Sequence, residues 1–242
     1  MRITRITASV HRPIAAGDQE SKATYAGTDG PVFVRCCVDT DEGIIGNGFT
    51  GRFLAAEAAH FLNHALAEAI TGEDPLGPDL MASLERRFNP RAMTGVVVSA
   101  LSALEIALTD IQAQAAGKSI AALLGGKRTR VPVHVTCGLP HLDIEALQAA
   151  TARAVAAGAA GVKIVIAAKG RPWQEDAERI LAVREAIGPD ADLIADANCG
   201  FDLPTARNLA FAVSDARLTW LEEPLRDNDP RRLAELTSEI DC

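Results

Sequence analysis

The spacing of apolar and polar positions changes near residue 126 and divides the chain into two parts. Before that point, apolar and polar residues alternate over residues 2–10 and 31–38, which is the period of a half-buried strand. The turn Asp41-Glu42-Gly43 then predicts a hairpin into Ile44-Ile45. Residues 13–30 are too many and too polar for a tight turn, so we expect a loop there that carries binding residues.

Helical periodicity follows these strands. Residues 93–116 are apolar nearly all round, which is typical of a helix buried between layers. Residues 119–124 predict a short helical turn that ends at Gly125-Gly126. Residues 54–70 predict an amphipathic helix with one buried stripe, made of Leu54, Ala58, Phe61, Leu62, Ala65, Leu66, Ala69 and Ile70. The first domain, residues 1–126, is therefore predicted to be α+β, an antiparallel sheet beside a group of helices.

After residue 131 strands and helices alternate. The predicted strands cover residues 131–136, 161–166, 192–196 and 219–223. The helices between and after them cover residues 143–157 and 174–187, one opens at Pro204, and one is capped by Asp229-Pro230. Four successive βα units imply a parallel sheet with right-handed crossovers. They are half of a barrel of eight, so residues 127–242 predict a partial (β/α) barrel.

Composition and charge narrow the classes of function. Hydrophobic residues make up 48% of the chain and aromatic residues only 4%, so small aliphatic side chains must fill the core. The net charge of −8 disfavours nucleic acid and anionic membranes as partners. We find no N-terminal signal segment and no stretch of transmembrane length. Five cysteines without disulfide or zinc spacing fit free thiols in the cytoplasm.

Polar residues stand where the predicted parallel strands end, the edge at which βα folds carry their chemistry. Asp196 and Glu222 end two adjacent strands, so their carboxylates can converge. Two carboxylates, completed by water and substrate oxygens, suit Mg²⁺. The alternative is that Asp196 caps a helix and Glu222 is solvated.

Lys163 shares one face of its strand with Val165, opposite Ile164 and Ile166. Because one face must meet the helices, we expect Lys163 on the open side of the sheet, where an ammonium needs a carboxylate or a substrate. It either takes part in chemistry or only stabilises the interior through an ion pair with Asp196. We also expect apolar residues such as Val165 and Leu221, or the neighbours of Leu221, on the open face, and the open face and edges to favour association into a homo-oligomer.

The motifs around these residues are more specific. Asp196-Ala197-Asn198 and Trp220-Leu221-Glu222-Glu223-Pro224, preceded by residues 43–48, 99–110 and 123–126, resemble the mandelate racemase/muconate lactonizing enzyme group of the enolase superfamily. The resemblance covers nearly the whole chain. It implies an N-terminal capping domain before a modified (β/α) barrel. It also implies Mg²⁺-dependent removal of a proton α to a carboxylate, through an enediolate.

The resemblance implies roles for individual residues. Asp196 and Glu222 would be metal ligands, and Asn198 would lie beside the metal or the substrate carboxylate. Lys163 is the candidate catalytic residue on these strands. Tyr25 and Arg52 would lie on substrate-facing loops of the capping domain. The implied substrate is a small carboxylate, an acid sugar.

Two departures from the group's pattern change the expected function. The group carries Lys-x-Lys where this chain has Lys163-Ile164-Val165, so the second lysine, commonly the base, is absent. A third carboxylate ligand is expected on a fifth strand, and the sequence ends at Cys242 before that strand. A base on one side of the substrate suits loss of water, so we expect an acid-sugar dehydratase, with this chain alone inactive. A racemase, epimerase or cycloisomerase is the second choice, and a non-catalytic remnant is the alternative from another class.

Overall fold

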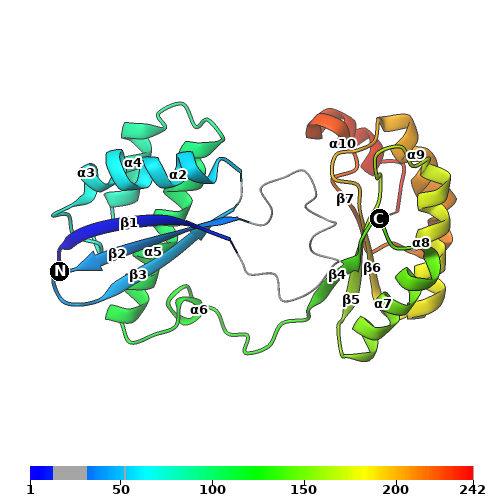
Figure 1. The fold of residues 1–242 in the computed structure, drawn as a ribbon, viewed down its shortest axis with the longest axis horizontal. Coiled ribbons are helices and arrows are strands. Elements are labelled where there is room, and N and C mark those ends of the chain that lie inside the picture. Colours follow the sequence, from blue (N-terminus) through cyan, green and yellow to red (C-terminus); the bar gives the residue numbers. More distant parts are fainter. Residues whose placement is uncertain (13–31, 52, 242) are drawn as a thin grey trace. The chain divides into compact units, whose positions relative to one another are not determined.

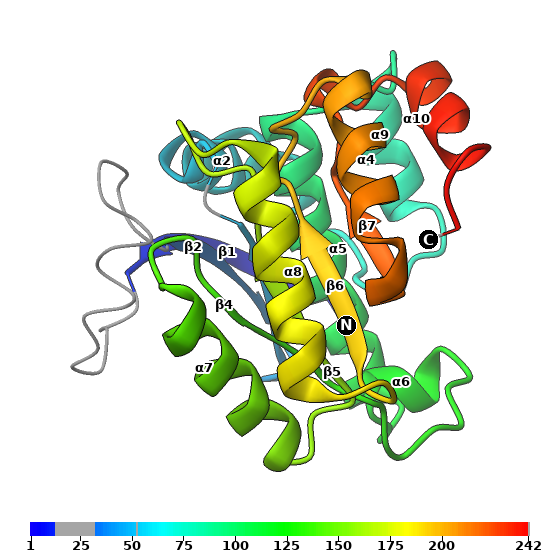
Figure 2. The same cartoon turned by 90° about the vertical axis from the view of Figure 1, so that its right-hand side faces the viewer.

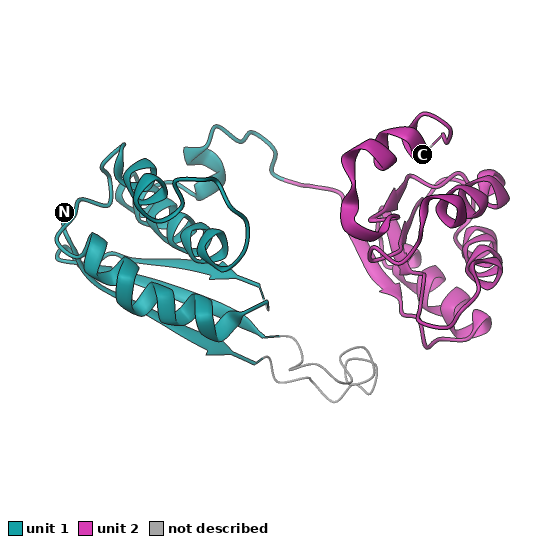
Figure 3. Ribbon diagram, turned by 90° about the horizontal axis from the view of Figure 1, so that it is seen from above, with its two compact units in different colours: residues 1–129 teal, residues 130–242 magenta. Residues whose placement is uncertain are grey.

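The protein is described by a computed structural model that covers residues 1–12, 32–51 and 53–241. Tyr25, Arg52 and the loop of residues 13–30 lie outside the described residues. The chain forms two compact units, Met1–Thr129 and Arg130–Cys242 (Figure 3). The first joins an antiparallel sheet to helices, and the second joins a parallel sheet to helices. The predicted fold class, a capping domain and a partial barrel, is confirmed at this level.

An antiparallel sheet of order β1-β2-β3 forms one layer of the first unit. Its strands are β1 (Ile3–His11), β2 (Phe33–Thr40) and β3 (Ile45–Thr50). The predicted hairpin joins β2 to β3, with Gly43 at φ +80° and the Thr40 hydroxyl donating to the Ile44 carbonyl at 2.9 Å. Val34, Cys36 and Val38 alternate along β2 with no exposed surface, so this face of the sheet meets the helices.

Helices cover that face of the sheet (Figure 1). They are α2 (Ala55–Phe61), the π-helical segment η1 (Leu62–Leu66), α3 (Ala67–Ile70), α4 (Leu80–Phe88) and α5 (Val96–Ala115). The short helix α6 (Ile120–Leu123) follows α5 and has no buried residue. The sequence patterns predict α5 and α6 within a few residues. They do not predict α4, which is short and whose last turn carries Arg86 and Arg87.

The predicted helix over residues 54–70 is interrupted by the π-helical turn η1. Ala58, Leu62, Leu66 and Ile70 are all fully buried at a spacing of four. In an α-helix, four residues turn through about 400°, so residues spaced by four move around the helix by about 40° at each step. The wider π-helical turn removes part of this rotation and keeps the four side chains facing the core. Leu54 was predicted to be buried, and this is wrong: it precedes the helix in a left-handed conformation and is 59% exposed.

Close contact between β3 and α5 depends on glycine and alanine. A Cβ atom on Gly48 would lie 1.8 Å from the Ala103 carbonyl oxygen, and one on Gly46 would lie 2.1 Å from that of Ala107. The motif at residues 43–48 therefore has a packing reason, because only hydrogen side chains let the helix come this near.

Helix α5 corrects one expectation about length. With 20 residues it is long and apolar enough to cross a membrane by composition alone, whereas no such stretch was predicted. A buried core helix has the same properties, and α5 packs its buried residues against the sheet.

The second unit is a parallel sheet of order β4-β5-β6-β7. Its strands are β4 (His134–Gly138), β5 (Gly161–Val165), β6 (Asp192–Asp196) and β7 (Trp220–Glu222). Helices α7 (Ile144–Ala156), α8 (Trp173–Ile187), α9 (Leu203–Ala212) and α10 (Pro230–Thr237) follow them in turn, with short 3-10 turns η2 (Ser214–Ala216) and η3 (Arg226–Asn228). The predicted βα alternation is confirmed, although β4 begins three residues late because Val131 and Val133 are exposed.

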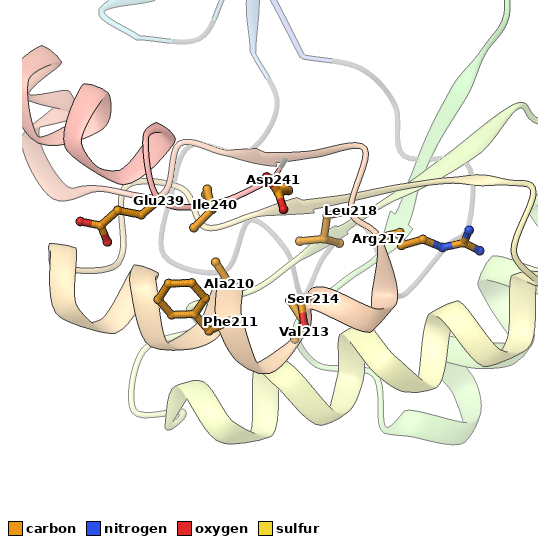
Figure 4. A pocket seen from close by; sticks show the side chains of 9 residues that line it. All are labelled: Ala210, Phe211, Val213, Ser214, Arg217, Leu218, Glu239, Ile240 and Asp241. Atoms are coloured by element: carbon orange, nitrogen blue, oxygen red, sulfur yellow. The ribbon is translucent and has the colours of Figure 1, made fainter.

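Aspartates begin three of these helices, as Asp143, Asp202 and Asp229 accept hydrogen bonds from first-turn N–H groups. Ion pairs from Arg207 to Glu235 and Glu239 tie α9 to the chain around α10. The last described residues then return over α9, where Ile240 and Asp241 enclose a small hollow of about 130 Å³ with Phe211 (Figure 4).

The two faces of the parallel sheet differ in chemistry. Helices α7, α8 and α9 cover one face (Figure 2), and Ile164, Leu193 and Ala195 lie in the core beneath them. Lys163 and Val165 lie on the other face, as predicted. Leu221 or its neighbours were predicted there too. Leu221 itself packs against the helix-side core, and the period of two places its neighbours Trp220 and Glu222 on the open face.

Candidate metal centre

Asp196 and Glu222 end the adjacent strands β6 and β7 and are register partners, so their side chains leave the same face of the sheet. The Lys163 ammonium lies between them, with Nζ 3.0 Å from Asp196 Oδ2 and 2.9 Å from Glu222 Oε1. The structure thus brings together three of the predicted site residues on the open face, at the carboxyl ends of the strands.

The second oxygen of each carboxylate is also fixed. Asp196 Oδ1 accepts a hydrogen bond from the Asn198 backbone N–H at 2.9 Å, and Glu222 Oε2 accepts one from the Trp220 indole N–H at 3.3 Å. Asn198 therefore supports Asp196 through its backbone. Sequence reasoning missed the part of Trp220, although the period of two places it beside Glu222.

The loops that follow these strands carry unusual backbone conformations. Positive φ angles occur at six non-glycine residues after β5, β6 and β7: Ala167, Asn198, Cys199, Glu223, Asp227 and Asn228. Such conformations cost roughly 1–3 kcal/mol each and concentrate at functional sites. The Cys199 N–H donates to the Glu223 carbonyl at 2.7 Å, which fixes two of these loops against each other.

The electrostatics favour a charged lysine. Partial burial opposes the charge on Lys163, but hydrogen bonds to Glu222 and Asp196 outweigh it and raise the pKa of the lysine. The hydrogen bond from Lys163 lowers the pKa of Glu222, with Trp220 acting in the same direction. Lys163 is thus an ammonium donor here, and two carboxylates share its single charge.

The donor set fits a hard cation such as Mg²⁺. Asp196 and Glu222 present carboxylate oxygens from fixed positions, and Mg²⁺ prefers oxygen and retains several waters. Within the described ranges, no group of three or more histidine, cysteine or acidic side chains is placed to hold a metal. The remaining positions around the ion would therefore belong to water and substrate oxygens.

Val165 stands at the position where the resemblance leads us to expect a second lysine. It is the register partner of Asp196 and lies on the same face as Lys163. Its side chain has no group that accepts a proton. At the level of Asp196 and Glu222, strand β5 therefore supplies no base.

A buried network supports the loops around this edge, and sequence reasoning missed it. Asp176 is fully buried and accepts a hydrogen bond from the Ala167 N–H at 2.9 Å. Arg179 donates to the Leu142 carbonyl at 2.6 Å and Arg171 to that of Pro140, also at 2.6 Å. Burial raises the pKa of Asp176 and lowers that of Arg179. The available signal was the helical spacing that places Asp176 and Arg179 on the same face as the apolar Ile180 and Val183.

We expect the ion pair of Glu222 to make the second unit acid-sensitive. The pKa of Glu222 is below its ordinary 4.5 in the folded state, so its stabilisation is present above 4.5 and is lost as pH falls through the lowered value. Urea unfolding between about pH 3 and 6 measures this. Glu222→Gln should reduce the fall in unfolding free energy at low pH, whereas the exposed control Glu185→Gln should leave that fall unchanged. Identical pH profiles for wild type and Glu222→Gln would contradict the stabilising role.

The comparisons with known proteins identify the family of the chain. The mandelate racemase/muconate lactonizing enzyme N-terminal domain family matches residues 6–125, and the enolase C-terminal domain-like family matches residues 146–242. L-talarate/galactarate dehydratase of Salmonella typhimurium strain LT2 is 32% identical over 179 residues, which are 73% of this chain and 44% of that protein. The matched region thus covers less than half the length of that relative.

Two solved structures share the fold. L-talarate dehydratase from Polaromonas sp. JS666, complexed with Mg and L-glucarate, is 28% identical with a TM-score of 0.82, covering 99% of this chain and 64% of that one. A racemase from Streptomyces coelicolor A3(2) with bound magnesium is 26% identical with a TM-score of 0.83, covering 98% and 66%. With both family matches and a relative that is 32% identical over 73% of the chain, the chain belongs to the mandelate racemase/muconate lactonizing enzyme group of the enolase superfamily.

Proposed function

We propose that this chain supplies the first metal-binding residues of a Mg²⁺-dependent active site that removes a proton α to a carboxylate. The observation that carries the proposal is the convergence of Asp196 and Glu222 on one point at the carboxyl ends of the strands, where Lys163 now lies 3.0 and 2.9 Å from them. A cation at that point is stabilised by both carboxylates.

Each residue has a distinct part in this proposal. Asp196 and Glu222 would hold Mg²⁺, with Asn198 and Trp220 fixing the carboxylates. When bound, Mg²⁺ supplies positive charge next to the substrate carboxylate, which eases loss of the α-proton. Lys163, as an ammonium, would donate a hydrogen bond to that carboxylate. Tyr25 and Arg52 stay proposed substrate-binding residues from the loops of the first unit.

Dehydration of an acid sugar is the reaction we favour. The relatives include acid-sugar dehydratases, and with Val165 in place of a second lysine a base would act on one face of the substrate only. Racemisation or epimerisation needs groups on both faces, and cycloisomerisation also occurs among the relatives, so these are the second candidates. We place the protein in the cytoplasm and expect homo-oligomers, since the edges of β4 and β7 can pair further.

Turnover by the 242-residue chain is expected to be undetectable. Acid–base catalysis requires a base within hydrogen-bond reach of the proton, and Val165 cannot act as one. The assay follows 2-keto acid formation and α-proton exchange in D₂O with a panel of acid sugars. Robust turnover that Lys163→Ala abolishes would instead identify Lys163 as the base.

Binding separates a partial active site from a non-catalytic remnant. With Mg²⁺ present, saturation-transfer NMR should detect L-glucarate on the wild-type chain and show no signal on Asp196→Asn. Asp190→Asn, in the exposed turn before β6, is the matched control and should bind normally. Absence of binding to the wild type would favour the remnant.

A further inference from the structure

A second polar hollow lies at the carboxyl edge of the parallel sheet, in the second unit. The loops after β5 and β6 and the turn η3 enclose about 470 Å³. Lys169, Arg171 and Arg226 line it, and Asp202 is the one carboxylate among the described residues around it. The chain as a whole carries a net charge of −8, so three cationic side chains around one hollow are contrary to its overall charge. This local charge favours an anionic ligand.

Arg171 is a fixed cation in the wall of the hollow. Its Nη1 is buried and forms an ion pair with Asp176 Oδ1 at 3.7 Å, and its Nε forms one with Glu175 Oε2 at 3.8 Å. Both separations are too long for hydrogen bonds. Arg171 Nη2 donates to the Pro140 carbonyl at 2.6 Å, so the guanidinium is held in place. Arg171 therefore contributes a fixed positive charge beside the hollow rather than a free N–H.

The start of α8 also borders the hollow, because its first residue, Trp173, lines it. The first turn of this helix carries Glu175 and Asp176, which offset the positive end of the helix dipole. The positive charge at the hollow therefore comes from side chains and not from the helix start.

The other two cations are free to turn toward a ligand. Lys169 is exposed and forms no ion pair with any residue that the structure describes. Arg226 makes one long contact, from Nη2 to the Gly200 carbonyl at 3.5 Å. Neither side chain is needed to hold the loops.

We propose that this hollow binds a phosphate-sized oxyanion, either inorganic phosphate or the phosphate group of a small metabolite. Cationic side chains approach it from two separate segments, Lys169 and Arg171 after β5 and Arg226 in η3, which suits a tetrahedral group with several oxygens better than a planar carboxylate. The site is independent of the Asp196–Glu222 centre, and its binding needs no Mg²⁺.

Calorimetry with inorganic phosphate at constant ionic strength tests the proposal. The double variant Lys169→Gln/Arg226→Gln should weaken binding at least tenfold, since removal of one charge-assisted hydrogen bond weakens binding by roughly that factor. Lys118→Gln/Arg128→Gln removes the same charge from the first unit and should bind like the wild type. Asp196→Asn should also leave phosphate binding unchanged. Arg171 is not varied because it supports the Pro140 loop.

Three outcomes would overturn the proposal: no phosphate binding by the wild type, equal binding by the double variant, or the same weakening by the control pair. Glucose 6-phosphate distinguishes the two sources, because tighter binding than inorganic phosphate assigns the hollow to a phosphorylated metabolite. Equal or weaker binding assigns it to the free ion. If L-glucarate binds more tightly than phosphate and the same double variant abolishes that binding, the hollow is a carboxylate site and the phosphate assignment is wrong.

Discussion

Replacing Lys163 with methionine should destabilise the second unit by about 2 kcal/mol in metal-free buffer. The ammonium is the shared partner of Asp196 and Glu222, and Asp196 is only 7% exposed. Without Lys163 the two carboxylates face each other without a counter-charge. This loss of stability is smaller than that for a fully buried ion pair. The side chains of Lys163 and Glu222 remain 23% and 33% exposed, so solvent screens their interaction.

Both tryptophans, Trp173 and Trp220, lie in the second unit, so their emission during urea unfolding reports this unit alone. Millimolar Mg²⁺ should restore much of the stability that Lys163→Met removes, because a cation then replaces the ammonium. Lys169→Met, which removes an exposed lysine of the same unit, is the control and should unfold like the wild type. Unchanged stability of Lys163→Met, with and without Mg²⁺, would show that the two carboxylates do not depend on Lys163.

Substitution of Gly48 by alanine should destabilise the first unit by about 3 kcal/mol. The added Cβ would lie 1.8 Å from the Ala103 carbonyl oxygen, so α5 must move off β3. Backbone atoms cannot rotate away as a flexible side chain would. The expected loss of stability is therefore at the upper end of the range for overpacking substitutions.

Gly51→Ala is the matched control, since a Cβ there would meet nothing within 4 Å. Far-UV circular dichroism during urea unfolding should show an earlier transition for Gly48→Ala and an unchanged one for Gly51→Ala. Tryptophan emission should remain as in the wild type for both, because both tryptophans lie in the other unit. Equal stability of the two variants would mean that β3 and α5 tolerate a methyl group between them.

Regular periodicity explains how much of this arrangement could be predicted. The period of two along β5 separates Lys163 from Ile164 correctly, and the spacing of one βα unit brings Asp196 beside Glu222. The strand β7 has only three residues, so its pattern alone does not assign its two faces. Once Glu222 is placed on the open face, the period of two puts Trp220 beside it and Leu221 on the helix side.

Other features depend on contacts that local patterns do not encode. The π-helical turn depends on how residues 54–70 meet the sheet, and Asn63 within it bonds the Ala8 backbone of the edge strand β1. The network of Arg171, Asp176 and Arg179 joins loops that are far apart in sequence. The strand pattern suggests Lys163 as a partner of Asp196, but its equal contact with Glu222 follows only from the packed sheet.

Titration of Mg²⁺ against Trp220 emission tests the central claim, a cation site at Asp196 and Glu222, most directly. The Trp220 indole donates to Glu222 Oε2, so an ion bound at Glu222 alters its surroundings. In a Trp173→Phe background, Trp220 is the sole emitting tryptophan. We predict a weak, saturable change in this protein, a tighter one after Lys163→Met, and none after Asp196→Asn. Tight stoichiometric binding that Asp196→Asn leaves unchanged would contradict the claim.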